Sequence, residues 1–293
     1  MKEDNKTYAA SLKSIETENI IDRAFYRPLG YAVTKMLLPL GISPNTVTII
    51  SIVIGASAGY FFHFPDITHN IYGILVLIIA NILDCVDGQL ARLTGKKTIL
   101  GRILDGLAGD IWFLSIYTGL ALRLSWEFGT YWFFAPALIS GLSHLVQANI
   151  TDYYKTLHLY FISKEKGSDF QSAEQVRRHK EQKPGFRKIF YLCYHKYTLL
   201  QEMATPKLQA MLHSLHEKYG DDFPEDIRTN FRQQSRKKMK LIELMTFNGR
   251  SIVLFIILFT EETWLYLLYE TFALNLVLTV SIHKHERMCA KFS

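Results

Sequence analysis

The sequence predicts an all-α integral membrane protein with six transmembrane helices. The chain has 293 residues, of which 49% are hydrophobic and only 20% are charged. Its apolar residues gather in stretches about long enough to cross a hydrocarbon layer of roughly 30 Å. Between these stretches, connections with and without basic residues alternate. The mean hydropathy of +0.07 therefore averages apolar spans with polar segments. The predicted spans are residues 46–64, 71–90, 103–124, 131–150, 250–268 and 270–283.

The positions of Lys and Arg predict the orientation of the chain in the membrane. Connections without these residues are 62–70, 125–130 and 260–263. Segments rich in them are 92–97, 155–240 and 283–293. The positive-inside rule places both termini and the two basic connections in the cytoplasm. Residues 1–19 are polar and have no apolar core, so we expect no cleavable signal peptide.

The N-terminal half divides into two predicted parts. Residues 1–44 form a cytoplasmic N-terminus with an amphipathic helix over 20–40. We expect this helix either to lie along the membrane surface or to pack on the bundle. Residues 45–154 hold the first four transmembrane helices, which begin directly after Pro44, a residue type common at helix starts.

The C-terminal half contains a long connection that is not apolar enough to cross a membrane. Residues 155–240 are rich in Lys and Arg and contain helix-like segments such as 206–219 and 224–240. They predict a basic cytoplasmic helical insert, which either lies against anionic head groups or forms a solvated cap. Residues 241–293 hold the last two transmembrane helices and a cytoplasmic tail.

The net charge of +6 indicates an acidic partner, for which nucleic acid and anionic lipid both qualify. Because the basic residues are sorted to one side of the predicted membrane, we expect lipid head groups and a diphosphate rather than nucleic acid. Three cysteines, Cys85, Cys193 and Cys289, are too few and too scattered for a disulfide framework or a structural zinc site.

The strongest chemical signal lies at the end of the second predicted span. Asp84 and Asp87 are three residues apart, so on a helix both carboxylates share one face. Gly88 and Ala91 continue this face without bulk, which leaves room for a ligand against the backbone. Arg92 then offers a planar guanidinium suited to phosphate oxygens.

Asp105, four residues after Gly101 on the next predicted helix, can complete the same site after a short turn. Hard divalent cations bind carboxylates on one side and phosphates on the other. Two such ions about 3.5–4 Å apart can clamp a diphosphate during phosphoryl-type transfer. The alternative is that the carboxylates are interfacial and pair with nearby basic side chains. These are Arg92, Lys96, Lys97 and Arg102.

Seven positions at fixed gaps resemble the signature of the CDP-alcohol phosphotransferases, membrane enzymes that make phospholipids from a cytidine-diphosphate donor and an alcohol. They are Asp84-x2-Asp87-Gly88-x2-Ala91-Arg92-x8-Gly101-x3-Asp105. Residues 26–29 and 41–48 are also similar to the family's approach to its first span. The resemblance covers roughly residues 20–150. It implies six transmembrane helices, a homodimer and a cytoplasm-facing cavity with two divalent ions, Mg²⁺ or Mn²⁺.

The resemblance also implies roles for single residues. The metal ligands would be Asp84, Asp87 and Asp105. The donor's cytidine and diphosphate would contact Asp84, Gly88, Ala91 and Arg92, together with Asn45 and Thr48 from the first span. The alcohol would attack the phosphorus of the transferred group, and CMP would leave.

One position departs from the family pattern, which has another aspartate four residues after Asp105. Gly109 occupies this position, and Asp110 follows it. Five residues turn a regular α-helix by about 500°, which would point Asp110 about 140° away from Asp105. We expect a π-bulge to return Asp110 to the cavity as the fourth carboxylate, with Asp110 and Asp105 as catalytic residues. The alternative is that another group or a water completes the second metal site.

Four further residues are predicted to line the substrate mouth, namely Lys97, Arg102, His144 and Arg250. The basic residues among them suit an anionic substrate, although basic residues at a cytoplasmic mouth also follow from topology alone. His144 belongs to a polar stripe with helical spacing in the fourth span. Its members are Ser140, His144, Gln147 and Thr151. Hydrogen bonds between helices are the alternative role for this stripe.

The predicted function is transfer of a phospho-substituted group from CDP-diacylglycerol to an alcohol of the inositol phosphate, inositol or glycerol phosphate type, with release of CMP. Within the same class, the alternative is transfer from a soluble CDP-alcohol to a lipid acceptor such as diacylglycerol or ceramide. A divalent-cation transporter would explain the aspartates but gives no reason for the small residues and Arg92. An inactive scaffold is the third possibility, suggested by Gly109.

Overall fold

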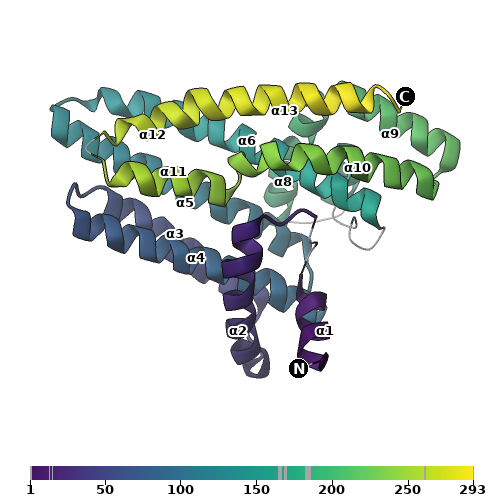
Figure 1. The fold of residues 1–293 in the computed structure, drawn as a ribbon, viewed down its shortest axis with the longest axis horizontal. Helices are drawn as coiled ribbons and strands as arrows, with labels where there is room; N and C mark the ends of the chain where they lie inside the picture. The colour runs from purple at the N-terminus through teal and green to yellow at the C-terminus, as the bar shows by residue number, and fades with distance from the viewer. Residues whose placement is uncertain are drawn as a thin grey trace. The chain divides into compact units, whose positions relative to one another are not determined.

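The computed structural model describes residues 2–12, 14, 16–163, 167, 170–181, 186–260 and 262–292. All regular elements within these residues are helical, which confirms the predicted fold class (Figure 1). The α-helices are α1 (Lys2–Ser11), α2 (Arg27–Leu37), α3 (Pro44–Phe62), α4 (Ile67–Thr94), α5 (Ile99–Phe128), α6 (Phe134–Ile162), α7 (Ala173–Glu181), α8 (Phe186–Ala204), α9 (Pro206–Tyr219), α10 (Glu225–Ile242), α11 (Phe247–Leu258), α12 (Trp264–Leu268) and α13 (Leu274–Cys289). Short turns of other helical types are η1 (Asp22–Tyr26), η2 (Leu38–Leu40), η3 (Tyr131–Phe133), η4 (Glu243–Met245) and η5 (Tyr269–Ala273), of which η1 and η5 are π-helical.

Among the described residues, six helical stretches are long and apolar enough to cross a membrane, which is the predicted number. They are Pro44–Phe62, Ile67–Thr94, Leu100–Phe128, Tyr131–Ile162, Glu225–Leu258 and Trp264–Cys289. The fourth stretch continues twelve residues beyond its predicted end at 150, because α6 runs unbroken to Ile162. The fifth includes the charged helix α10 before the apolar helix α11, and it ends at Leu258, ten residues before its predicted end at 268. Residues 264–268 belong instead to the sixth stretch. The chain is therefore an integral, multi-pass membrane protein, and its orientation stays a prediction.

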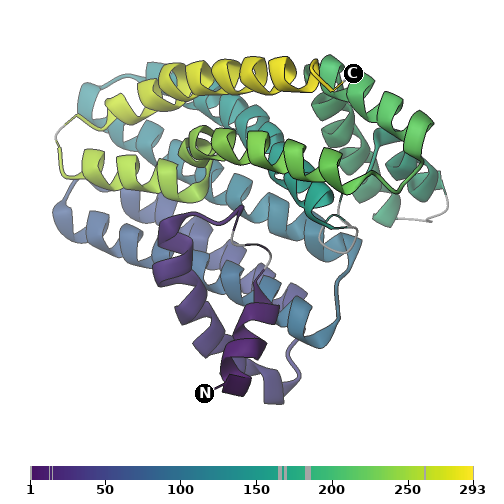
Figure 2. The ribbon, with the colours of Figure 1, turned by 45° about the vertical axis from the view of Figure 1, so that its right-hand side comes forward.

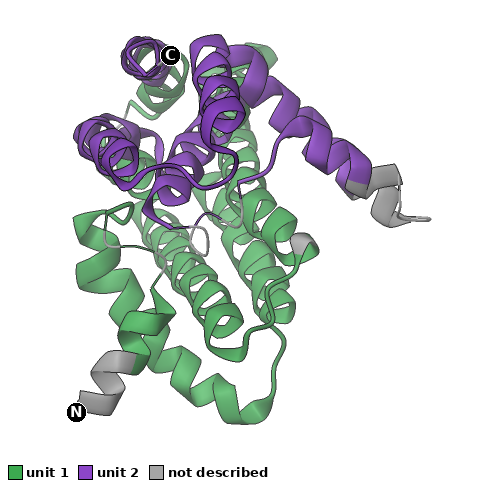
Figure 3. Cartoon of the chain, turned by 90° about the vertical axis from the view of Figure 1, so that its right-hand side faces the viewer, with its two compact units in different colours: residues 1–145, 247–273 green, residues 146–246, 274–293 purple. Residues whose placement is uncertain are grey.

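The chain folds into two compact units (Figure 3). The first comprises residues 1–145 and 247–273, and the second comprises residues 146–246 and 274–293. Helix α6 contributes to both. The four-part division by membrane position is a separate prediction, which the two units do not test.

Helices α3, α4 and α5 are the centre of the first unit, and their ends are set by local sequence. Ser43 caps α3 by accepting a hydrogen bond from the Thr46 backbone N–H, and Pro44 follows at the first helical position. Asp66 caps α4 in the same way. Helix α4 ends at Gly95, whose φ of +67° lies in the left-handed region that glycine adopts without strain. Thr98 then caps α5 through the Gly101 backbone N–H, at 2.9 Å.

Glycine residues bring α3 and α5 into close contact. A Cβ added at Gly59 would overlap the backbone of Ser115, and one at Gly119 would overlap the backbone of Gly59. A Cβ at Gly55 would overlap the ring of Trp112, whose Nε1 donates to the Ser51 carbonyl oxygen at 3.0 Å. The spacing of Gly55 and Gly59 therefore serves packing within the chain.

The second unit contains the predicted insert. Helix α9 has the bounds expected for residues 206–219, and α10 begins after Pro224 as expected. Helices α10 and α13 lie side by side in both ribbon views (Figures 1 and 2). The Glu286 carboxylate of α13 accepts hydrogen bonds from the first backbone N–H groups of α9, at Lys207 (2.7 Å) and Leu208 (3.1 Å). A negative charge is favourable at such a helix start.

Candidate active site

Three carboxylates meet where α4 turns into α5. Asp84 and Asp87 lie near the end of α4, and Asp105 lies near the start of α5. The short connection between Gly95 and Thr98 joins the two helices, and α3 packs against both of them. One oxygen from each carboxylate lies within 4.8 Å of the other two. The structure therefore brings together the three aspartates that the sequence singled out.

The negative charge of this cluster favours binding of a cation. Asp87 is only 4% exposed, and its Oδ2 atom is buried with no hydrogen-bond partner among the described residues. Carboxylates held this close repel one another unless a positive charge lies between them. Hard divalent cations such as Mg²⁺ and Mn²⁺ take such oxygens as ligands. The residues present thus fit the metal site that the sequence predicts.

Residues of α3 also reach the cluster. Asn45 lies against the first turn of α5, because a Cβ added at Gly101 would lie 2.8 Å from its Oδ1 atom. Gly101 thus allows the two helices to approach each other. Thr48 is buried and neighbours the Asp87 carboxylate. Thr48 is therefore beside the Asp87 carboxylate, and Asn45 is beside the first turn of the helix that carries Asp105.

Arg92 is anchored on one side only. Its Nε atom donates to the backbone carbonyl of Ser11, at the end of α1. Its Nη2 atom is buried and has no hydrogen-bond partner within the described part of the chain. A Cβ added at Gly88 would lie 3.2 Å from Nη2, so the glycine leaves room for the guanidinium beside the helix. A buried N–H group without a hydrogen-bond partner is suited to bind an anionic ligand.

A second arginine, Arg27, lies near the cluster, and the sequence predicted no role for it. Arg27, at the start of α2, forms an ion pair with Glu18 at 3.3 Å. Burial acts to lower the pKa of Arg27, but neighbouring groups that can carry a negative charge raise it more, so the net shift is upward. These neighbours are Cys85, Glu18, Asp22 and Asp84. The guanidinium therefore stays charged close to the aspartates. The similarity of residues 26–29 to the family pattern was the signal that could have indicated Arg27.

Asp110 does not lie with the other three aspartates. Helix α5 is a regular α-helix from Ile99 to Phe128, a range whose backbone is fully described, so the expected π-bulge between Asp105 and Asp110 is absent. The regular helix turns Asp110 away from Asp105 by about 140°. Its carboxylate lies 3.5 Å from Nε2 of His144 on α6, and the other ring nitrogen of His144 lies 3.0 Å from the Tyr117 hydroxyl.

The position that the family pattern gives to an aspartate is open. A Cβ added at Gly109 would meet no atom within 4 Å, and the same is true of Gly106. Because Gly109 follows Asp105 by four residues, it lies only about 40° from it around the helix axis. A face of α5 next to Asp105 therefore carries no side chain at these two positions.

The four predicted mouth residues fall into two groups. Lys97 is exposed in the turn between α4 and α5, and Arg102 is half-buried in the first turn of α5, close to Asp105. His144 and Arg250 are instead buried, at 4% and 1% exposure. Arg250 forms an ion pair with Glu270 inside the first unit.

The polar stripe of α6 contacts other helices. The Ser140 hydroxyl donates to the Leu267 carbonyl oxygen at 3.1 Å, and Gln147 Nε2 donates to Asn275 Oδ1 at 2.8 Å. These contacts support the alternative role of the stripe, which is to form hydrogen bonds between helices.

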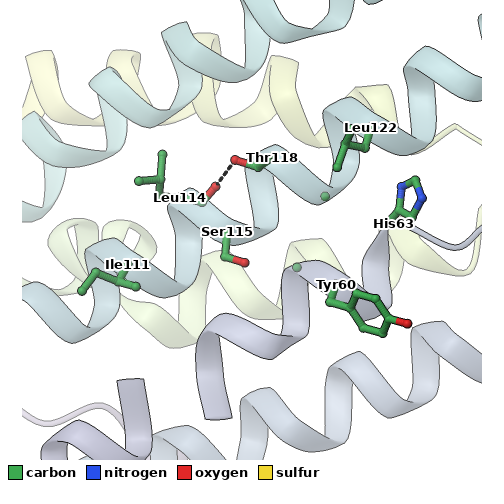
Figure 4. A pocket seen from close by; sticks show the side chains of 9 residues that line it. Tyr60, His63, Ile111, Leu114, Ser115, Thr118 and Leu122 are labelled. Atoms are coloured by element: carbon green, nitrogen blue, oxygen red, sulfur yellow. Dashed lines mark hydrogen bonds between the residues drawn. The ribbon is translucent and has the colours of Figure 1, made fainter. Parts of the chain in front are cut away.

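A pocket of about 420 Å³ lies elsewhere, between α3 and α5 (Figure 4). Its lining is mainly apolar and includes Leu114 and Leu122. The Ser115 hydroxyl donates to the Ala56 carbonyl oxygen, and the Thr118 hydroxyl donates to that of Leu114. None of the predicted site residues lines this pocket, which lies between two membrane-spanning candidates.

The fold and the acidic cluster define a multi-pass membrane protein with a carboxylate site suited to divalent metal. Residues 41–166 match the family model described as CDP-alcohol phosphatidyltransferase, so the chain carries a domain of this family. The matched range includes the whole acidic cluster. This match confirms the family resemblance that the signature residues indicated.

Curated relatives share this part of the chain. Over 88 residues it is 39% identical to archaetidylinositol phosphate synthase of Pyrococcus horikoshii, covering 30% of this chain and 45% of the relative. Over 100 residues it is 30% identical to phosphatidylinositol phosphate synthase of Streptomyces avermitilis, covering 34% and 40%. Over 181 residues it is 26% identical to mouse cholinephosphotransferase 1, covering 53% and 46%. The chain thus spans about half the length of the curated relatives it matches.

Proposed function

We propose that the protein transfers a phospho-substituted group from a CDP-linked donor to an alcohol and releases CMP. The observation that carries this proposal is the meeting of Asp84, Asp87 and Asp105 within the segment that matches the family model. The active site would face the cytoplasm, as the distribution of Lys and Arg predicts.

The residues of the site would have different roles in binding the metal ions and the donor. The three aspartates would hold divalent cations, Mg²⁺ or Mn²⁺, two of which operate during turnover. When bound, such ions neutralise phosphate charge and align the attacking and leaving oxygens. Gly88 leaves space along α4 for the Arg92 guanidinium, and Arg92 would bind the donor's phosphate oxygens with its unpaired Nη2 atom.

The reaction exchanges the phosphoanhydride bond of the donor for a phosphate ester bond to the alcohol. The alcohol oxygen forms a bond to the phosphorus of the transferred group, and the bond from this phosphorus to the oxygen of CMP breaks. The alcohol proton passes to a carboxylate, and CMP leaves with the bonding electron pair. Asp105 is the best placed base, since it is the exposed member of the cluster and borders the open face at Gly109.

For the substrates, we favour CDP-diacylglycerol as donor and a phosphorylated polyol as acceptor. Two relatives are named for inositol phosphate lipids, and a third, from Wigglesworthia glossinidia brevipalpis, is a CDP-diacylglycerol–glycerol-3-phosphate 3-phosphatidyltransferase. Lys97 and Arg102, close to Asp105 in the chain, add positive charge suited to an acceptor phosphate. The mouse cholinephosphotransferase supports the alternative pairing of a soluble CDP-alcohol with a lipid acceptor.

The test is CMP release from the purified full chain in lipid nanodiscs with Mg²⁺. One series pairs CDP-diacylglycerol with inositol phosphate, inositol or glycerol phosphate, and a second pairs soluble CDP-alcohols with diacylglycerol or ceramide. Mass spectrometry follows CMP and the lipid product together. We expect both in the first series. No CMP from any pairing would contradict the transferase proposal and favour an inactive scaffold or an ion transporter.

We also propose that the protein is a homodimer, on the strength of the family resemblance alone. Light scattering of the detergent-solubilised protein, corrected for bound detergent, measures the protein mass. A mass twice that of one chain supports the dimer, and the mass of a single chain contradicts it.

A further inference from the structure

The acidic cluster offers protein ligands for one divalent cation more readily than for two. Among the described residues, the group that could hold a metal at this site consists of Asp84, Asp87 and Asp105. The buried Oδ2 atom of Asp87 has no hydrogen-bond partner in the described part of the chain, so it is a candidate ligand oxygen without a hydration shell to lose. A cation here satisfies this oxygen and relieves the repulsion among the carboxylates.

A second ion would need further oxygen ligands. Asp110, the next carboxylate along the chain, lies about 7.5 Å further along the helix axis than Asp105 and about 140° around it. It is also engaged by His144 at 3.5 Å. Residue 109, which lies on the same face as Asp105, is a glycine, and no atom lies within 4 Å of where its Cβ would be.

The charge balance leads to the same conclusion. Three carboxylates carry three negative charges, whereas two divalent cations carry four positive charges, and Arg92 adds another nearby. The charges of Arg27 and Glu18 offset each other in their ion pair. An uncompensated positive charge is costly in a partly buried site. A diphosphate would correct this balance and would also supply oxygens, which are the ligands that Mg²⁺ takes from bound substrates.

We propose that the protein alone holds one divalent cation at Asp84, Asp87 and Asp105, and that the second ion binds only together with the diphosphate of the donor. The phosphate oxygens then occupy the open face beside Gly109, where a fourth carboxylate would otherwise lie. This inference rests on the proposed function, since it assumes a nucleoside-diphosphate donor.

The experiment measures bound Mn²⁺ per chain by equilibrium dialysis of the purified full chain, with electron paramagnetic resonance as a second readout. Binding that persists in an Asp84→Asn, Asp87→Asn variant is subtracted as non-specific. We expect about one ion per chain without nucleotide and about two with CDP. CMP, which lacks the second phosphate, should leave the ratio at about one. Two ions without nucleotide, or one ion with CDP, would overturn the proposal.

A substitution at residue 109 provides the matched control. Gly109→Asp should restore the fourth carboxylate and raise the ratio to about two without nucleotide, because the space around this position is open. Gly109→Asn has the same size without the charge and should stay at about one. Size-exclusion profiles identical to that of the natural protein establish that both variants are folded. A Gly109→Asp protein that is folded but binds only one ion would contradict the assigned geometry.

The outcome is separable from that of the CMP assay. A protein that releases no CMP from any donor but shows the step from one to two ions with CDP would contradict the transferase proposal and support this inference. A protein that releases CMP but binds two ions without nucleotide would support the transferase proposal and contradict this inference.

Discussion

The guanidinium of Arg250 on α11 forms an ion pair with the Glu270 carboxylate in the π-helical turn η5, and both side chains are almost completely buried. The Tyr266 hydroxyl donates a second hydrogen bond to Glu270 at 2.8 Å. The Arg250 guanidinium also lies over the Phe113 ring, 5.8 Å from its centroid. This pair joins the last two membrane-spanning helices to α5 within the first unit.

Removing one partner of this pair should be strongly destabilising. We expect Glu270→Ala to lower the free energy of unfolding by about 3–5 kcal/mol, because it leaves Arg250 charged and buried without its partner. Unfolding in a detergent titration, followed by circular dichroism, measures the change. The double variant Arg250→Met, Glu270→Met should recover most of the loss. A single variant as stable as the natural protein would show that the pair is not buried in the membrane-embedded state.

Loss of a cluster carboxylate should abolish activity. We expect Asp87→Asn to reduce CMP release by about a hundredfold or more, since the amide cannot replace a charged metal ligand. Asp66→Asn is the matched control, because it makes the same change at the other end of α4 and asparagine still caps the helix. Equal activity of the two variants would exclude the cluster as the site.

Asp110 should matter less than Asp105. Because Asp110 faces His144 on a regular helix, we expect Asp110→Asn to retain CMP release within about tenfold and to leave the affinity for Mn²⁺ unchanged. Asp105→Asn, measured alongside, should lose both. If Asp110→Asn lost activity and Mn²⁺ binding together, helix α5 would have to rewind locally in the active enzyme and Asp110 would be a metal ligand after all.

The glycine contact between α3 and α5 should tolerate no added methyl group. Gly59→Ala places a Cβ against the Ser115 backbone, and we expect a loss of about 1–3 kcal/mol from overpacking. Gly141→Ala is the matched control, since its Cβ would lie 3.7 Å from the nearest atom, an ordinary contact. The same detergent titration should show little change or a small gain for this control. Equal effects of both changes would contradict the close packing.

Local patterns in the sequence predicted most of the fold and the core of the site. Hydropathy predicted six spans because each is a continuous stretch, and helical periodicity predicted that Asp84 and Asp87 share a face. The same periodicity correctly predicted that Asp110 points away from Asp105 on a regular helix. The predicted π-bulge between them was wrong. Periodicity could not show that Arg250 and His144 are buried, and their place at the substrate mouth stays a prediction. Their environment depends on partners from other helices.

Contacts between distant segments account for what sequence reasoning missed. The bond from Arg92 to Ser11 and the ion pair of Arg27 with Glu18 join the N-terminal segment to the region of the signature. No spacing rule connects these residues. The three clustered carboxylates, by contrast, could be predicted as a group because only a short connection separates the helices that carry them.

That short connection, from Gly95 to Thr98, also has a consequence for synthesis of the protein. All three cluster carboxylates lie between residues 84 and 105, and α3 packs against both helices that carry them. Chains grow from the N-terminus, and contacts close in sequence form early. The three carboxylates can therefore come together once α5 has been made, while the ribosome is still translating the last two spans.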